Sequence, residues 1–240
     1  MIMLSLNYAN HGTVNRFRRR RALLLRQQID DAVRRLGRDL VIMDVGGRPD
    51  YWLNLPSMDG ISRIDLMNFE ESELDRPLPD GAPKDLFTRS VGDARNLAGH
   101  ESKSIDFVHS NSVIEHVGGW DDIGAMATEL RRVGRAGWMQ TPAWSFPIEP
   151  HFHVAFMHWF GAPMRARMLS LSAAKRFRRM PLARRRRVVE AVNLLSRSEV
   201  AHLFPNCTIH TERVALLAKS YVAYWHLDDA VQDGAVMQAA

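Results

Sequence analysis

The chain has 240 residues, 46% of them hydrophobic, and a net charge of +5. This composition supports a buried core and excludes a fibrous or disordered chain. No stretch reaches the roughly 18 apolar residues of a membrane-spanning helix, and residues 1–10 lack a signal-peptide pattern. The single Cys207 excludes an internal disulfide and a zinc site built on several thiolates. We therefore expect one domain with an insertion, in a reducing, cytoplasmic setting.

Hydrophobic patterning predicts strands that alternate with helices. The strands are predicted over residues 39–45, 61–68, 86–91, 104–110, 137–141, 207–214 and 217–225. Helices are predicted over 14–36, 120–133, 184–195 and 198–203, and the first belongs to a basic N-terminal segment, 1–37, that carries Arg16 and Arg18–Arg21. This order predicts an α/β fold: a doubly wound, mostly parallel seven-stranded sheet with an antiparallel last strand in an edge hairpin.

Polar residues gather where the predicted strands end. They are Asp44, Asn68, Asp93 and the run Asn111–His116. In a parallel sheet with right-handed crossovers, the functional loops lie at the carboxyl ends of the strands. The clustering therefore predicts a ligand site at this edge.

The first strand ends in the turn Asp44-Val45-Gly46-Gly47. Glycine lets the backbone approach a ligand closely because it has no Cβ. Arg48-Pro49 stands where a dinucleotide-binding fingerprint carries further glycines. The turn therefore favours a ligand without phosphates over the dinucleotide of a dehydrogenase, although a purely structural turn is also compatible with it.

Several segments in order resemble the type 11 group of class I S-adenosylmethionine-dependent methyltransferases. They are Val41–Gly47 (VIMDVGG), Gly92–Leu97 (GDARNL), Phe107–Val117 (FVHSNSVIEHV) and Phe146–His151 (FPIEPH), of which the third is the most specific. The resemblance covers nearly the whole chain from about residue 14. It implies the Rossmann-like methyltransferase fold and S-adenosylmethionine as the cofactor.

The resemblance also implies cofactor contacts. Gly46 and Gly47 would line the methionine part, with Asp44 reaching its ammonium directly or through water. Either Asp65 or Asn68 would hold the ribose. Asp93 would accept a hydrogen bond from the adenine amino group beside the backbone of Ala94. Asn111 and Ser112 would close the pocket beneath the sulfonium.

The implied reaction is in-line displacement of the sulfonium methyl group, for which the protein mainly positions the reactants. A hydroxyl acceptor would use a general base, a role that suits histidine. His151 is the preferred candidate and His116 the second, with a helix-capping role as the alternative for His116. Neither Glu115-His116 nor Glu149–His153 has a diagnostic metal spacing such as H-E-x-x-H, so we expect no metal.

Residues 142–195 interrupt the strand pattern and are interpreted as a helical lid or acceptor insertion. Aromatic residues open it, and ten of the chain's 32 basic residues follow between Glu149 and Glu190, where there is no acidic residue. The aromatic residues could form an apolar wall or simply pack the insertion. The arginines could be a solvated helix face, a site for an anionic acceptor or membrane surface, or, least favoured, a nucleic-acid site.

The predicted function is methyl transfer from S-adenosylmethionine to a small-molecule or glycan- or lipid-linked acceptor, at oxygen. The alternative is a methyltransferase-like binding or assembly module whose arginine clusters hold an anionic partner. Both are compatible with a cytoplasmic protein that is peripheral at a membrane, and with a homodimer.

Overall fold

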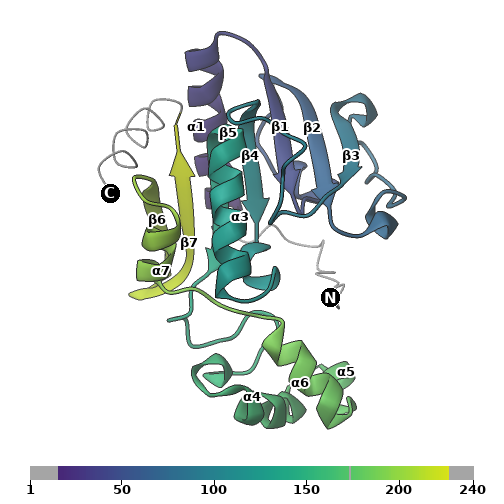
Figure 1. The fold of residues 1–240 in the computed structure, drawn as a ribbon, viewed down its shortest axis with the longest axis vertical. Helices are drawn as coiled ribbons and strands as arrows, with labels where there is room; N and C mark the ends of the chain where they lie inside the picture. The colour runs from purple at the N-terminus through teal and green to yellow at the C-terminus, as the bar shows by residue number, and fades with distance from the viewer. Residues whose placement is uncertain (1–15, 173, 227–240) are drawn as a thin grey trace.

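The computed structural model describes residues 16–172 and 174–226, and within them one sheet of seven strands runs through the molecule (Figure 1). The strand order is β3-β2-β1-β4-β5-β7-β6. Strands β1 to β5 pair in parallel, and β7 is antiparallel to both β5 and β6. The predicted α/β sheet with an antiparallel edge hairpin is confirmed. The strands are β1 (Leu40–Val45), β2 (Ile61–Asn68), β3 (Phe87–Val91), β4 (Ile105–Asn111), β5 (Gly134–Pro142), β6 (Thr208–Val214) and β7 (Leu217–Trp225).

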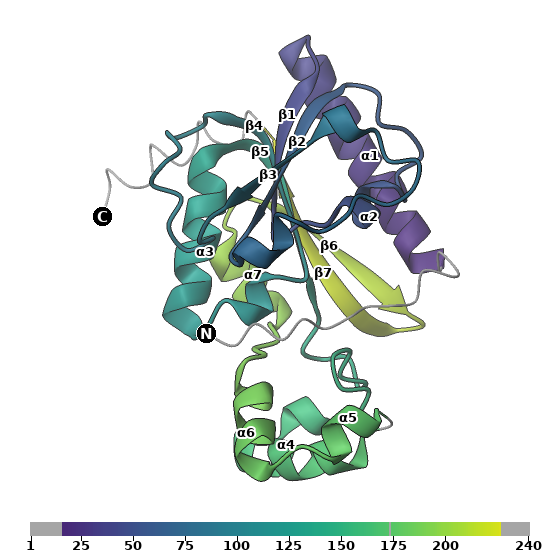
Figure 2. The same ribbon diagram turned by 90° about the vertical axis from the view of Figure 1, so that its right-hand side faces the viewer.

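Helices cover both faces of the sheet, with α1 on one face and α3 and α7 on the other (Figure 2). The helices are α1 (Arg16–Leu36), α2 (Pro49–Trp52), α3 (Trp120–Val133), α4 (Ala162–Met168), α5 (Lys175–Arg178), α6 (Leu182–Glu190) and α7 (Arg197–Leu203). The predicted helix over 14–36 corresponds to α1, and its first two residues lie outside the described part of the chain. None of the described helices is both long enough and apolar enough to cross a bilayer.

Strand β1 owes its central position to side chains that are apolar on both faces. Leu40 and Ile42 are buried in the core beneath α1, whereas Met43 and Val45 are buried in the core beneath α3. Successive side chains of a strand point to opposite faces, so a continuous apolar run suits a strand that is covered on both sides. The chain therefore reaches the Gly46-Gly47 turn from the middle of the sheet.

The predicted insertion, 142–195, begins in the structure after Pro142, which is the last residue of β5. It forms a helical unit beyond the carboxyl ends of the strands, seen below the sheet in Figures 1 and 2. This unit has its own core, which includes Phe152, Phe177 and Val189. The predicted helix over 184–195 is shorter in the structure, where α6 ends at Glu190. The backbone N–H of Asn193 instead donates to the carbonyl of Glu115 at 2.8 Å, which returns the chain toward the sheet.

Strand β5 begins three residues earlier than the pattern predicted. Gly134 already pairs with Ile105 of β4. The glycines and Arg135 at its start lack the apolar signature of a buried strand, yet β4 supplies the partner for pairing there. Pairing with β4 therefore overrides weak local strand propensity at these residues.

Candidate cofactor and acceptor site

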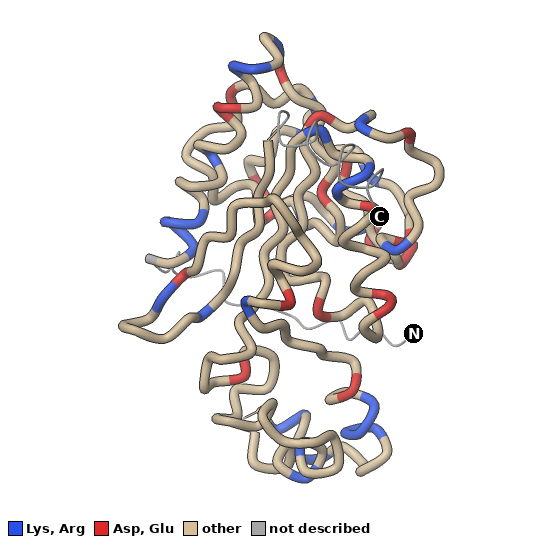
Figure 3. The backbone as a smooth tube through the Cα atoms, turned by 60° about the vertical axis from the view of Figure 1, so that its left-hand side comes forward, with Lys and Arg blue, Asp and Glu red and all other residues tan. Residues whose placement is uncertain are grey.

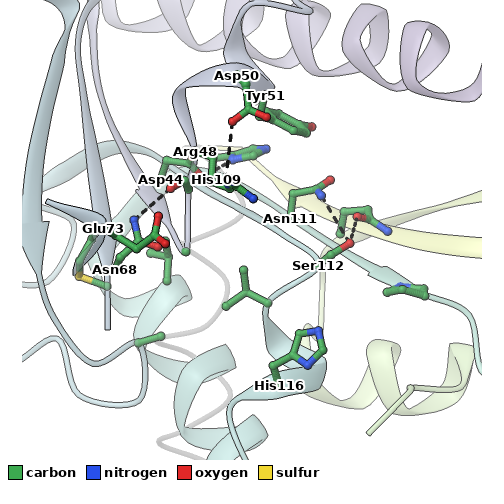
Figure 4. A pocket seen from close by; sticks show the side chains of 18 of the residues that line it. Asp44, Arg48, Asp50, Tyr51, Asn68, Glu73, His109, Asn111, Ser112 and His116 are labelled. Carbon is green, nitrogen blue, oxygen red and sulfur yellow. Dashed lines mark hydrogen bonds and ion pairs between the residues drawn. The ribbon is translucent and has the colours of Figure 1, made fainter. Parts of the chain in front are cut away.

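A cleft of about 1340 Å³ lies at the carboxyl ends of the parallel strands, between the sheet and the insertion. The cofactor residues expected from the sequence line it, with the exception of Asp65, and so do His116 and His151. Figure 4 shows Asn68 and Glu73 on one wall, with Asn111, Ser112 and His116 across from them. The expected residues in the lining are Asp44, Gly46, Gly47, Asn68, Asp93, Ala94, Asn111 and Ser112.

The turn after β1 requires glycine at both of its positions. Gly46 has a φ of +72°, and a Cβ placed on it would lie 2.5 Å from Cγ2 of Val113. A Cβ on Gly47 would lie 2.0 Å from Oδ2 of Asp44. Both positions therefore exclude larger side chains, and they leave backbone as the wall of the cleft.

Asp44 anchors this turn from within the protein. Its side chain is 1% exposed, and its two oxygens accept hydrogen bonds from Trp52 Nε1 and His109 Nδ1, each at 2.6 Å. The carboxylate thus ties α2 and β4 to the turn. The contact with the cofactor's ammonium, which the resemblance implied, competes with these two donors. Sequence analysis did not identify Trp52 or His109 as its partners, because neither lies at a spacing that signals the contact.

The two alternatives for the ribose contact, Asp65 and Asn68, lie on opposite faces of β2, because they are three positions apart along the strand. Asp65 accepts hydrogen bonds from Ser90 at 3.0 Å and Thr88 at 3.4 Å, and it lies outside the cleft lining. The Asp65 assignment does not fit this geometry. Asn68 lines the cleft at the strand end, and its Nδ2 donates to the carbonyl of Gly47 at 3.0 Å. We therefore retain Asn68.

Asp93 is held in place by Arg95, a residue that was not among the predicted site residues. Arg95 Nε and Nη2 donate to the Asp93 carboxylate at 2.9 and 2.7 Å, and Nη1 donates to Asp122 at 2.9 Å. These hydrogen bonds hold the pKa of Asp93 below its ordinary value. The carboxylate is therefore ionised at neutral pH and fixed next to the buried Ala94.

Arg21 reaches the opposite wall of the cleft from α1. Its Nη1 donates to Asn111 Oδ1 at 3.0 Å and to Gln140 Oε1 at 3.1 Å. Ser112, in the left-handed conformation at φ 56°, donates its hydroxyl proton to the same Gln140 oxygen at 3.0 Å. Within the run Arg18–Arg21 of the basic N-terminal segment, Arg21 is therefore an internal residue that orients Asn111.

A buried acid–histidine cluster lies at the other end of the cleft. The turn Ile114–His116 after β4 and the loop after β5 bring Glu115, His116 and His151 together, with one polar atom of each within 4.8 Å of the others. The His151 Nε2 and Glu115 Oε1 atoms are 3.8 Å apart, and the rings of His116 and His151 meet edge to face. His151 is far from Glu115 and His116 in the sequence, so no spacing rule could have detected the cluster.

Each member of the cluster has a second partner. His151 Nδ1 lies 2.6 Å from Glu149 Oε1, and Glu149 also accepts from the backbone N–H of Phe152 at 2.6 Å. Thr141 donates its hydroxyl proton to Glu115 Oε2 at 3.0 Å. His116 Nδ1 lies 3.4 Å from the carbonyl oxygen of Ala191.

Burial shifts the pKa of every member of the cluster, and at His151 it is outweighed by Glu149. It raises the pKa of Glu115, and together with the charge of His151 it lowers the pKa of His116 to about 4. Burial also opposes protonation of His151, but the hydrogen bond and charge of Glu149 raise the pKa of His151 above its ordinary value. His116 is therefore neutral at neutral pH, and His151 is the stronger base.

No protein-family model and no curated protein matches the sequence. Solved structures match at the level of the fold. The DszA carbon methyltransferase has a TM-score of 0.56 at 13% identity, covering 90% of this chain and 55% of that chain. Monomeric WbdD, from a bifunctional kinase-methyltransferase, has 0.53 at 16% identity, covering 89% and 42%. The methyltransferase domain of bacterial CtHen1-CN has 0.50 at 13%, covering 88% and 100%.

At these identities the likeness shows the fold alone, which this chain shares with these methyltransferase structures. The chain spans about 40% of the length of the WbdD chains that it matches. The narrower resemblance to the type 11 group stays a prediction.

Proposed function

We propose that this chain transfers the methyl group of S-adenosylmethionine to a hydroxyl oxygen of its acceptor. The observation that carries the proposal is that one cleft joins the glycine turn of β1 to the cluster of Glu115, His116 and His151. The glycine-turn end of the cleft offers backbone and polar groups that suit S-adenosylmethionine, the methyl donor. The second end offers buried groups that can receive or stabilise a proton.

The donor end would hold the cofactor in an extended form along the strand ends. Gly46 and Gly47 would lie against its methionine part, and Asn68 would bind the ribose hydroxyls. Asp93, kept ionised by Arg95, would accept from the adenine amino group. Asn111 and Ser112, oriented through Arg21 and Gln140, would then close the pocket near the sulfonium.

At the acceptor end, His151 is the group positioned to take the proton of the hydroxyl. Its Nδ1 proton is held by Glu149, which leaves Nε2 as the basic atom. The hydroxyl oxygen would form a bond to the methyl carbon while the carbon–sulfur bond breaks, and the proton would pass to Nε2. Positioning the two reactants in line supplies most of the acceleration in such a transfer.

The lining of the cleft favours an acceptor with an apolar part and an anionic part. The insertion contributes Phe146 and Ile148, and Arg18 and Lys219 line the cleft from α1 and β7. A hydroxylated small molecule with an acidic group, or a glycan or lipid linked through phosphate, has this chemistry.

The insertion also supports association with an anionic membrane surface. Figure 3 shows its Lys and Arg residues gathered in the unit that carries few acidic residues. Arg167, Arg178 and Arg187 are exposed, as are Trp159 and Phe160 on the same unit. Clustered basic residues attract anionic headgroups, and exposed aromatic side chains suit the membrane interface.

The decisive experiment is isothermal titration calorimetry of the purified chain with S-adenosylhomocysteine, the demethylated cofactor. Binding of one equivalent, followed by transfer of a labelled methyl group to a hydroxylated acceptor, would support the proposal. If the chain binds neither S-adenosylmethionine nor its product, yet sediments with phosphatidylglycerol vesicles in a salt-sensitive way, it is instead an anion-binding module that uses the methyltransferase fold. Phosphatidylcholine vesicles are the matched control for the sedimentation.

A further inference from the structure

The acid–histidine cluster brings together three side chains of the types that bind metal ions. The spacing of Glu115-His116 and of His151 along the chain argued against a metal, but spacing rules apply to ligands from one continuous motif. Here the fold brings ligand types from two separate segments within 4.8 Å. A metal site also requires that a nitrogen of each histidine and an oxygen of Glu115 be free to coordinate the ion.

Both histidines have one ring nitrogen occupied by an acceptor. Glu149 faces Nδ1 of His151 at 2.6 Å, and the carbonyl of Ala191 faces Nδ1 of His116 at 3.4 Å. Each Nδ1 therefore carries the proton, and each Nε2 presents a lone pair. Histidines that bind metals are held in this way, with the outer nitrogen donating to a carboxylate or a backbone carbonyl.

The third group is a carboxylate oxygen without a partner. Glu115 is fully buried, and its Oε1 has no hydrogen-bond partner among the residues that the structure describes, whereas Oε2 accepts from Thr141. A buried polar atom left unsatisfied is costly. Oε1 lies 3.8 Å from His151 Nε2, too far for a hydrogen bond. Ligands that share one metal ion, each about 2.0–2.2 Å from it, lie roughly 3–4 Å apart.

We propose that Glu115, His116 and His151 bind one divalent transition-metal ion, with Glu149 as the positioning residue for His151. Two imidazole nitrogens and one carboxylate oxygen suit ions such as Zn²⁺, Co²⁺, Fe²⁺ or Mn²⁺, whereas Mg²⁺ and Ca²⁺ prefer oxygen ligands. His116 and His151 both line the cleft, so the remaining coordination position lies on the cleft side.

The role of such an ion rests on the proposed function. A coordinated hydroxyl is a stronger acid than a free one. It would release its proton to solvent, and its oxygen would then bond to the methyl carbon as the carbon–sulfur bond breaks. In the metal-bound protein His151 is thus a ligand, and its action as a base is confined to the metal-free protein.

The test is a Co²⁺ titration of the full chain after treatment with a chelator, without cofactor, followed by the visible absorption bands of protein-bound Co²⁺ and by calorimetry. We expect one equivalent to bind. Glu115→Gln, His116→Asn and His151→Gln should each weaken binding by more than about a hundredfold, since loss of an outer partner alone costs roughly 10–100-fold. Glu149→Gln should fall within that smaller range.

His153→Gln is the matched control, because His153 is exposed and lines the same cleft outside the cluster. Its affinity for Co²⁺ should equal that of the unmodified chain. His116 is only partly buried, so His116→Asn serves if a change at Glu115 or His151 prevents folding. Absence of Co²⁺, Zn²⁺ and Mn²⁺ binding, or binding that survives His116→Asn unchanged, would overturn the site. Because no cofactor is present, this result is independent of whether the chain binds S-adenosylhomocysteine.

Discussion

Arg21 of α1 and Glu212 of β6 form a bidentate ion pair, in which Arg21 Nε lies 2.8 Å from Glu212 Oε1 and Arg21 Nη2 lies 2.5 Å from Glu212 Oε2. Their side chains are 13% and 8% exposed. The remaining guanidinium nitrogen holds Asn111 at the cleft. One arginine therefore joins the first described helix, the edge strand and the wall of the candidate site, which makes its loss informative about both stability and binding.

Replacing Arg21 with alanine should lower the free energy of unfolding by about 3–5 kcal/mol, because it leaves the buried Glu212 carboxylate unpaired. Urea denaturation followed by circular dichroism measures this change. Arg20→Ala is the control, since Arg20 is exposed on the same helix and its loss should cost less than about 0.5 kcal/mol. Equal costs for the two variants would contradict the internal role of Arg21.

The same ion pair predicts a pH dependence. Burial alone would raise the pKa of Glu212, but the hydrogen bonds and charge of Arg21 hold the pKa below its ordinary value. A lowered pKa in the folded state adds stability above the unfolded value of about 4.3, and this contribution is lost as pH falls through the folded pKa. The unfolding free energy of the unmodified chain should thus fall more steeply below about pH 4.3 than that of Glu212→Gln. Parallel profiles would refute this.

The hydrogen bond from Trp52 Nε1 to Asp44 predicts a stability cost when Trp52 is replaced. Trp52→Phe leaves one oxygen of a buried carboxylate without its donor, which should cost about 1–3 kcal/mol, and the smaller ring adds the cost of a cavity in the core. Trp120→Phe is the matched control, because Trp120 is 46% exposed. Denaturation curves of the two variants check the difference, and a Trp52→Phe chain as stable as the control would show that the hydrogen bond contributes little.

The glycine turn after β1 has no room for a side chain at Gly46 or Gly47, so substitutions there should disturb the cofactor end of the cleft. Gly47→Ala would place a methyl group against the Asp44 carboxylate, and Gly46→Val would combine a clash at Val113 with a positive φ. Both variants should abolish measurable binding of S-adenosylhomocysteine by calorimetry. Gly99→Ala is the control, because a Cβ at Gly99 meets no atom within 4 Å. Retained binding in Gly47→Ala would place the cofactor elsewhere.

Asp65 and Asn68 lie on opposite faces of β2, so their replacement should affect cofactor binding differently. Asn68→Ala should weaken S-adenosylhomocysteine binding about tenfold, the effect of roughly one lost hydrogen bond. Asp65→Ala should leave the affinity unchanged, because Asp65 lies outside the cleft lining. The reverse pattern in calorimetry would return the ribose contact to Asp65.

The sheet was predictable because its strands carry their own signals. The bounds of β2 and β7 agree with the predicted ranges, and β1 is a continuous apolar run that ends at glycines. In a parallel sheet the carboxyl ends of the strands meet at one edge, so the sequence predicts that Asn68, Asp93 and Asn111 lie near the glycine turn. The start of β5 could not, because strand pairing rather than local sequence decides it.

The fold class and the edge of the sheet that carries the cleft could be predicted from the sequence, since both follow from periodicities of a few residues. Which side chains contact one another in the cleft depends on the tertiary structure. In the structure Asp65 lies outside the cleft lining and Arg21 contacts Asn111. Glu115, after β4, lies 3.8 Å from His151 of the insertion. Such contacts depend on the packing of segments that are distant in the chain, and side-chain direction and partnership are not encoded in local spacing.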